Sequence, residues 1–271
     1  MRTITKRIEY TSRSDVFRIV PISDVHLGNV ACDEKLLKAT VQSIADDPFS
    51  YWIGGGDYCE FIKRRDWRWD PEVISDWLFG EPDVAAQQIK RARDYLLPIA
   101  DKCLGLVKGN HEDDILRKWE HDVYATLVEA LAPNGKQPQI RLGFSGFIVL
   151  RFTRMVNGTK GTTWTLPIFA THGWWGGRLY GNGALNLEKV FGWVDAQIVL
   201  AGHDHKKRAF PISRIKPSRS GKVEKVDGFC CSCGSFLDMA KYAEYKGYRP
   251  LPVGPLEIFV TPDKREVRVV Q

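Results

Sequence analysis

The stretch Ser23-Asp24-Val25-His26-Leu27-Gly28 decides how the rest of this sequence is interpreted. It follows residues 17–22, a short apolar run that is typical of a buried strand. Asp24 and His26 therefore stand where a strand ends in a loop, which is the edge of an open α/β sheet where ligands bind. Residues two apart on an extended chain point the same way, so one carboxylate and one imidazole can converge on one metal ion.

The composition is that of a soluble globular protein. The chain has 271 residues, of which 44% are hydrophobic and 27% charged, and its formal net charge of +6 mildly favours anionic partners. No apolar run reaches the roughly 18 residues of a membrane span, and the basic N-terminus lacks the apolar core of a signal peptide. Six cysteines in so long a chain are no disulfide framework, so a reducing, cytoplasmic location is expected. Cys230-x-x-Cys233 resembles half a zinc site, but no second pair completes it, so buried or loop thiols are expected.

The spacing of apolar residues predicts helices and strands in alternation. Helices are expected at residues 33–45, 83–97, 113–131 and 184–194. Strands are expected at residues 17–22, 51–53, 104–107, 147–152, 163–170, 198–201, 206–215, 223–231, 256–260 and 267–270, with a turn near Asn157-Gly158. Because no internal repeat or low-complexity linker occurs, residues 1–271 are interpreted as one domain. Within it, residues 58–80 are a candidate cap insertion and residues 206–231 a basic hairpin.

Several predicted strands end in residues that can bind a metal. Five of the six histidines follow such strands, which scattered histidines would rarely do: His26, His111, His172, His203 and His205. Glycines precede several of these residues and allow a strand to end abruptly. Mixed nitrogen and oxygen donors suit Mn²⁺, Fe²⁺ or Zn²⁺, and Asp57 is the natural bridge between two metals about 3.5–4 Å apart. The candidate ligands are Asp24, His26, Asp57, Asn110, His172, His203 and His205.

In this order, these residues resemble the complete motif set of the calcineurin-like metallophosphoesterases. The motifs are Asp24-x-His26, Gly56-Asp57-x-x-Glu60, Gly109-Asn110-His111-Glu112, His172 and Gly202-His203-x-His205. The resemblance implies an α/β (α+β) fold, a two-layered β-sandwich flanked by helices, with a dinuclear metal site at the carboxyl ends of the strands. It implies that one divalent ion is held by Asp24, His26, Asp57 and His205, and the other by Asp57, Asn110, His172 and His203. Mn²⁺ is the expected metal, with Fe²⁺, Zn²⁺ or Ni²⁺ as alternatives.

The resemblance also implies a mechanism. A hydroxide that bridges the two metals attacks phosphorus in line. His111 is not a ligand in that family; it contacts the phosphate and can protonate the leaving oxygen. We expect Glu112 and Asp204 to orient the histidines or the helix start. The alternative for Glu112 is a first-turn acid that the helix dipole favours.

The details of the motifs favour one branch of that family. Glu60-Phe61-Ile62 stands where serine/threonine protein phosphatases carry Asp-Arg-Gly, and Lys108 stands where they carry arginine. The ending Gly202-His203-Asp204-His205 is closer to the phosphodiesterase and exonuclease branch. We therefore predict an enzyme that hydrolyses phosphodiesters of nucleotides or nucleic acid. The alternatives are a phosphomonoesterase or pyrophosphohydrolase of the same fold, and a non-catalytic protein-binding scaffold.

Substrate contacts are expected from two insertions. In the segment 63–77, Trp67 and Trp69 can stack bases and the basic residues can meet phosphates. The equal alternative is an amphipathic helix whose tryptophans pack on the core. Trp174 and Arg178 follow His172 and are expected to line the site. The hairpin residues Lys206, Lys207, Arg208, Arg219 and Lys222 are expected to be solvated, and the oligomeric state is left open.

Overall fold

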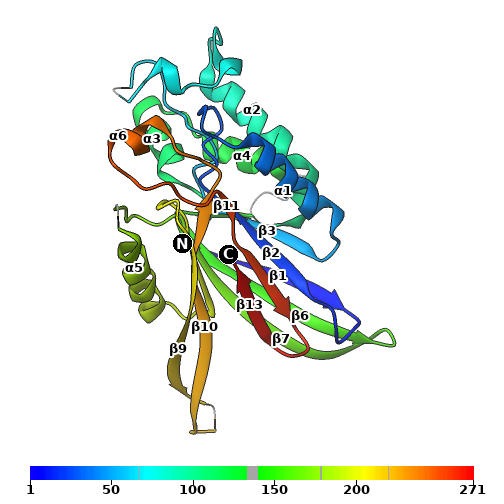
Figure 1. Cartoon of the computed structure of the whole chain (residues 1–271). Coiled ribbons are helices and arrows are strands. Elements are labelled where there is room, and N and C mark those ends of the chain that lie inside the picture. Colours follow the sequence, from blue (N-terminus) through cyan, green and yellow to red (C-terminus); the bar gives the residue numbers. More distant parts are fainter. Residues whose placement is uncertain (67, 133–139, 178, 219) are drawn as a thin grey trace.

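The computed structural model describes residues 1–66, 68–132, 140–177, 179–218 and 220–271. Its strands form two sheets that pack against each other, and helices cover both outer faces (Figure 1). The predicted two-layered α/β sandwich flanked by helices is therefore confirmed. In the described parts of the chain, no helix is both long and apolar enough to cross a bilayer.

One sheet has six strands in the order β13-β12-β2-β3-β4-β5. Strands β2, β3, β4 and β5 are parallel to one another. Strand β12 pairs antiparallel with both β2 and β13. The carboxyl ends of β2, β3 and β4 therefore lie at one edge of this sheet. The bounds are β2 (Phe17–Ile22), β3 (Ser50–Gly54), β4 (Cys103–Val107), β5 (Arg141–Gly143), β12 (Glu257–Thr261) and β13 (Glu266–Val270).

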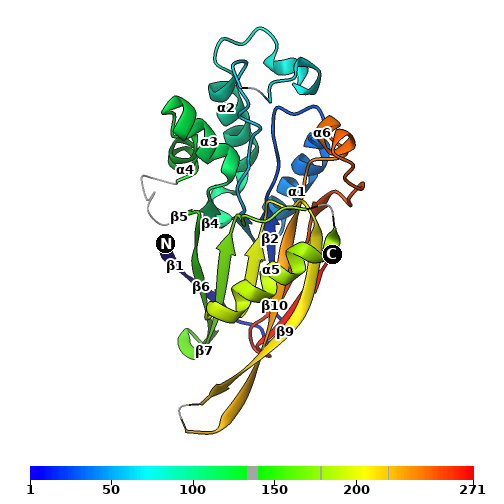
Figure 2. The same cartoon turned by 90° about the vertical axis from the view of Figure 1, so that its left-hand side faces the viewer.

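The other sheet has seven strands in the order β1-β6-β7-β8-β10-β11, with β9 paired to β10. Asn157 and Gly158, at φ 49° and 76°, make the predicted turn between β6 and β7. Strands β9 and β10 form the predicted hairpin, which extends beyond the body of the protein (Figure 2). The bounds are β1 (Arg2–Tyr10), β6 (Ser145–Val156), β7 (Thr159–Thr171), β8 (Ile198–Ala201), β9 (Lys207–Pro217), β10 (Val223–Ser235) and β11 (Gly254–Pro255).

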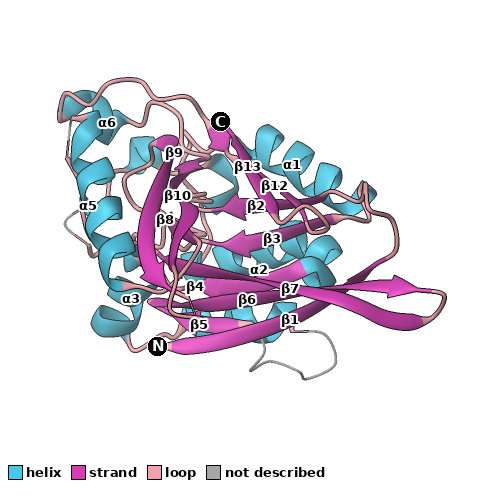
Figure 3. Cartoon of the chain, turned by 90° about the horizontal axis from the view of Figure 1, so that it is seen from below, coloured by secondary structure: helices cyan, strands magenta, loops and turns pink. Residues whose placement is uncertain are grey.

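The helices lie on both sides of the sandwich, with α5 on the side of β8 and β10 and α1 on the side of β2 and β12 (Figure 3). Helices α1, α2 and α4 each begin at an aspartate whose side chain caps the helix: Asp33, Asp83 and Asp122. The helices are α1 (Glu34–Asp46), α2 (Val84–Leu96), α3 (Asn110–Trp119), α4 (Val123–Leu131), α5 (Tyr180–Trp193) and α6 (Lys241–Tyr245). Short 3₁₀ turns are η1 (Pro71–Val73), η2 (Asp76–Leu78) and η3 (Leu97–Lys102).

Strand β2 shows why the central strands read as continuous apolar runs. Ile19 belongs to the core between the two sheets, whereas Val20 and Ile22 belong to the core under α1, α2 and α4. Alternate residues of a strand point to opposite faces, so a strand covered on both sides needs apolar residues throughout. This double burial fixes β2 in the molecule and places Asp24 and His26 directly after it.

The prediction of one helix over residues 113–131 is wrong. The segment forms two helices, α3 and α4, which are separated at Glu120. Glu120 has φ 54°, a left-handed conformation that ends α3, and the side chain of Asp122 accepts a hydrogen bond from Ala125 N to cap α4. The apolar residues recur every fourth position across the break, so their periodicity alone does not reveal it. Helix α3 also begins at Asn110, which puts Asn110 and His111 in its first turn.

Candidate metal centre

The structure brings all seven candidate ligands together at one end of the sandwich. Asp24 and His26 follow β2, Asp57 follows β3, and Asn110 starts the helix that follows β4. From the other sheet, His172 follows β7, while His203 and His205 follow β8. Six of these side chains form two groups whose nitrogen and oxygen atoms lie close enough to hold a metal ion: Asp24, His26 and His205, and Asp57, His172 and His203. A third group of this kind, His26, Glu60 and His111, shares His26 with the first.

In the first group, His205 Nε2 lies 3.3 Å from Asp24 Oδ1 and 3.3 Å from His26 Nε2. Asp24 and His26 come from the loop after β2 in the six-stranded sheet, and His205 comes from the loop after β8 in the seven-stranded sheet. Because two imidazole nitrogens and one carboxylate oxygen converge on one point, the group offers the mixed donors that divalent transition metals prefer.

In the second group, His172 Nε2 lies 3.1 Å from Asp57 Oδ2. Asn110 Oδ1 completes the group, 3.0 Å from His172 Nε2 and 2.8 Å from His203 Nδ1. Asp57 Oδ2 is also 3.9 Å from His26 Nε2 in the first group. Asp57 therefore lies between the two groups, in the position that the sequence predicts for a bridging ligand.

Five of the seven candidate ligands have a left-handed backbone, which is uncommon for residues other than glycine. Their φ angles are 51° for Asp24, 52° for His26, 52° for Asp57, 72° for His203 and 56° for His205. Such conformations cost free energy and persist at functional sites where the surroundings enforce them. The strand ends of this protein are thus bent so that their polar side chains point to one place.

Neighbouring groups fix the orientation of two ligand histidines. Glu60 Oε2 lies 2.9 Å from His26 Nδ1, and Gly55 O lies 2.8 Å from His172 Nδ1. Each acceptor holds a proton on Nδ1 and leaves Nε2 to face the candidate metal position, the arrangement by which outer partners tune a metal-binding histidine. The role of Glu60 was not predicted, although its position three residues after Asp57 in the motif was the available signal.

Glu112 holds the backbone of the site. Its carboxylate accepts hydrogen bonds from Asp57 N at 2.9 Å, Tyr58 N at 2.8 Å and Gly109 N at 2.8 Å. Burial and the charge of Asp57 raise the pKa of Glu112 to about 7, against the opposing effect of the backbone bonds. Glu112 thus ties the loop after β3 to the loop after β4, which agrees with the expected positioning role.

The charges of the metal-free site are strongly coupled. Burial raises the pKa of Asp24 to about 6, whereas the positive charges of His172 and His111 overcome burial and hold the pKa of Asp57 well below its usual range. Against the effect of burial, Glu60 raises the pKa of His26 to about 9, and Asp57 raises that of His172 to about 10. Protons on these two histidines therefore supply positive charge between the carboxylates, which is where a bound cation would place it.

Burial has the opposite effect on the two histidines that follow β8. It lowers the pKa of His203 to about 4 and that of His205 well below its usual range. Both rings are therefore neutral near pH 7 and ready to act as ligands, since a metal ligand must be deprotonated. The donor set, its convergence and its charge all fit divalent metal ions.

His111 lies beside the first group, with its ring centroid 4.7 Å from that of His26. Its backbone N donates to Asp57 Oδ1 at 2.9 Å, and its Nδ1 lies 2.5 Å from Glu60 O. The carbonyl oxygen accepts the Nδ1 proton, so Nε2 is the ring atom that remains available to a ligand.

The candidate cap differs from the amphipathic helix that was one interpretation of residues 63–77. In the part of this segment that the structure describes, the helical elements are the 3₁₀ turns η1 and η2, and Trp69 packs against the apolar cluster of Ile74, Leu78 and Val84. Arg68 is paired with Asp66 and Asp114. Trp67 and Arg178 lie outside the described residues.

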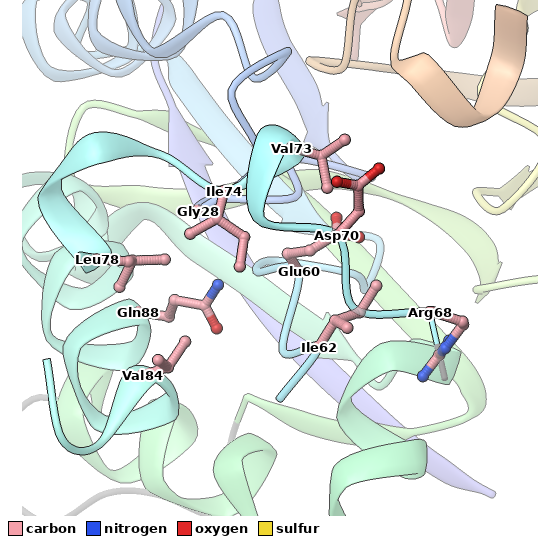
Figure 4. Close-up of a pocket in the computed structure, with 10 residues that line it drawn as sticks. All are labelled: Gly28, Glu60, Ile62, Arg68, Asp70, Val73, Ile74, Leu78, Val84 and Gln88. Carbon is pink, nitrogen blue, oxygen red and sulfur yellow. The ribbon is translucent and has the colours of Figure 1, made fainter. Parts of the chain in front are cut away.

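A small cavity, about 10 Å³, separates this segment from Glu60 and Gln88 (Figure 4). Its volume is enough for about one water molecule and too small for a substrate. Gln88 closes it by donating to Leu27 O at 3.0 Å and accepting from Phe61 N at 3.1 Å. The described part of the cap therefore packs closely against Gly28, Glu60 and Gln88.

Two other expectations concern the tryptophans and the basic hairpin. Trp174 is 63% exposed two residues after His172, and its ring meets that of the buried Trp175 edge-on at 4.9 Å. The expectation that the hairpin cations are solvated is wrong for Lys206 and Arg208, which are both buried because they bind groups of the chain itself. The three cysteines of β10 are buried free thiols, as expected, and no cysteine belongs to a candidate metal group among the described residues.

No family model and no curated protein matches this sequence. Solved structures do match. A predicted phosphoesterase from Streptococcus pneumoniae is 13% identical over 94% of each chain, with a TM-score of 0.34. Vps29 from Entamoeba histolytica, in complex with Zn²⁺, is 13% identical over 93% of this chain and 90% of that one, with a TM-score of 0.37. A Thermotoga maritima protein is 17% identical over 93% and 96%, with a TM-score of 0.31. At these values, we base the functional assignment on the site itself.

Proposed function

We propose that this protein is a metal-dependent phosphoesterase of the calcineurin-like type that hydrolyses phosphodiesters. The observation that carries the proposal is the pair of ligand groups with Asp57 between them. Two adjacent cation positions that share a carboxylate are the arrangement of enzymes that displace groups at phosphorus. The motif set described above supports the same class of reaction.

The candidate ligands are assigned to two proposed cation positions. Asp24, His26 and His205 would hold one cation, Asn110, His172 and His203 the other, and Asp57 would contact both. When bound, two divalent cations would lower the pKa of a nucleophilic water and neutralise charge on the phosphoryl oxygens. Mn²⁺ is the proposed native metal.

His111 is the proposed catalytic residue. With Nδ1 directed to Glu60 O, its Nε2 can donate to a phosphoryl oxygen or give a proton to the leaving oxygen. Glu60 and Glu112 act through other residues, because their carboxylates bind His26 and the backbone around Asp57. Trp174 is the described aromatic side chain proposed to contact the organic part of the substrate.

A hydrolysis screen tests the proposal. The metal-stripped protein is reloaded with Mn²⁺ and tested on bis-p-nitrophenyl phosphate, p-nitrophenyl phosphate, single- and double-stranded DNA, RNA and cyclic nucleotides. Asp57→Ala is the inactive control, and His121→Ala is the matched control because His121 lies outside the ligand groups. Diester cleavage lost in Asp57→Ala and kept in His121→Ala supports the proposal.

The other outcomes are equally informative. Cleavage of monoesters alone would replace the diesterase proposal with a phosphomonoesterase. A lack of turnover with Mn²⁺, and with Fe²⁺, Zn²⁺ or Ni²⁺ in its place, would overturn enzymatic function and favour a protein-binding scaffold. In that case, Asp57→Ala would leave partner binding intact.

A further inference from the structure

Two cations that follow the last ligand, His205, are buried in the protein. Lys206 and Arg208 are each only 3% exposed, which is rare for charged side chains unless they are paired. Lys206 Nζ donates to Gly177 O at 2.7 Å and to Leu179 O at 3.1 Å. Arg208 Nη1 donates to Tyr180 O at 2.7 Å. Both side chains therefore hold the backbone of the segment that joins β7 to α5.

Asp204, which lies between His203 and His205 in the sequence, also takes part in this arrangement. Arg208 Nη2 donates to Asp204 Oδ2 at 2.5 Å, and both side chains are almost fully buried. Arg208 also lies 4.6 Å from the centre of the Tyr180 ring. A Cβ on Gly183 would stand 2.2 Å from Asp204 Oδ2, so the first turn of α5 packs directly on the ion pair.

The segment held in this way begins at a ligand. Gly173 follows His172, and a Cβ at Gly173 would lie 3.3 Å from Gly202 O and 3.6 Å from His203 Cβ. Trp174 comes next, with its indole exposed. The hydroxyl of Tyr180 adds a further bond by donating to Lys207 O. The segment that joins His172 to α5 is thus fixed to the strand that begins after His205.

Arg214 provides an internal comparison. It lies on the same strand, β9, and its Nη1 donates to Val194 O at 2.8 Å while Nη2 pairs with Asp195. It therefore attaches the other end of α5 to β9. Arg208 and Arg214 make the same kind of contact, but only the Arg208 contact lies next to the ligand groups.

We propose that Asp204, Lys206 and Arg208 are positioning residues that hold Trp174 at the mouth of the site, and that Trp174 selects diesters whose second ester group is an aromatic ring or a base. The inference rests on the proposed function. An exposed indole offers a flat apolar face on which a base or another aromatic ring can stack. The three positioning residues act through the loop, without contact to metal or phosphate.

Kinetics with two diesters test the selection. For Arg208→Met and Trp174→Ala, we expect KM for bis-p-nitrophenyl phosphate to rise about tenfold, as loss of stacking predicts. For Arg208→Met, we expect kcat and metal content to stay near the wild-type values, and KM for methyl p-nitrophenyl phosphate to change little. Arg214→Met should leave both substrates unaffected. Equal effects of Arg208→Met and Arg214→Met, or equal effects on both diesters, would overturn the inference.

Two further measurements keep the test decisive. Arg208→Met leaves the Asp204 carboxylate buried without its partner, so this variant could fail to fold. In that case the double variant Asp204→Asn/Arg208→Met, which removes both charges, is used in its place. Amide hydrogen exchange, which needs no activity, should accelerate in residues 173–182 of either variant and in residues 190–196 of Arg214→Met. Unchanged exchange in residues 173–182 would refute the positioning role. If the wild type cleaves no diester while exchange behaves as expected, the proposed function fails and the positioning role stands.

Discussion

The Nε2 atoms of His26 and His205 lie 3.3 Å apart, although the two residues are separated by 179 positions in the chain. Each ring comes from a different sheet, and each is held by a left-handed backbone at the end of a strand. Two imidazole nitrogens directed at each other in a buried site need a shared cation or proton between them. In the second group, His172 Nε2 instead faces Asp57 Oδ2 at 3.1 Å and Asn110 Oδ1 at 3.0 Å.

Asp57→Ala should remove both metals, because this carboxylate lies between the two ligand groups. We expect the metal content of the purified protein to fall from about two ions per chain to well under one. Elemental analysis after loading with Mn²⁺ measures this, with His121→Ala as the control that keeps its metals. Equal metal content in Asp57→Ala and the wild type would contradict the site assignment.

His111→Ala should keep the metals and lose turnover. His111 is proposed to offer its Nε2 to the substrate and belongs to neither group formed by the seven candidate ligands, although it lies close to His26 and Glu60. Loss of one such donor typically lowers kcat by about 10²–10³. Metal analysis and steady-state kinetics on bis-p-nitrophenyl phosphate are measured on the same preparation. A variant that loses its metals along with its activity would show that His111 is a ligand instead.

Metal binding should release protons. The pKa values of His26 and His172, raised to about 9 and about 10, mean that both rings are protonated at neutral pH in the metal-free protein. These raised values stabilise the metal-free fold fully below their ordinary pKa of 6.5, and the stabilisation is lost as pH rises through 9 to 10. Because metal ligands must be deprotonated, Mn²⁺ affinity should increase from about pH 6 to about pH 8. Titration calorimetry in buffers of different ionisation enthalpy counts the protons, and an affinity independent of pH would refute this account.

Glu112→Gln should destabilise the protein. The amide places a donor group where a carboxylate oxygen now accepts backbone N–H bonds from Asp57, Tyr58 and Gly109. Each buried N–H left without an acceptor costs about 1–3 kcal/mol. Urea unfolding measures the loss, with the exposed Glu129→Gln on α4 as the control. If Glu112→Gln matches Glu129→Gln in stability, Glu112 is only a first-turn acid.

Much of the fold and site followed from local signals. The apolar run of β2 and the polar residues directly after it predicted both the strand and the position of Asp24 and His26. Strand ends are favourable for prediction because hydrophobic burial stops abruptly where the ligand loop begins. The same reasoning located Asp57, His172 and His203.

The features that were missed depend on contacts between distant parts of the chain. Nothing near Arg208 in the sequence shows that Tyr180 O will accept a hydrogen bond from its guanidinium group. The sequence alone therefore predicts a solvated basic run. Glu120 was placed inside a helix because its left-handed backbone leaves the apolar spacing intact. The basic residues of segment 63–77 were one candidate for phosphate contacts, but Arg68 among them is paired with Asp66 and Asp114 in the folded protein.

The division of the ligands between the two sheets has a consequence for how the protein matures. The first cation position needs His205 from the seven-stranded sheet and His26 from the six-stranded one, and the second position needs His172 and Asp57 in the same way. Neither sheet can build half of the centre alone, so a nascent or partly unfolded chain has no site to load. If the protein binds metal as proposed, metal uptake would therefore report that the two layers have packed together correctly.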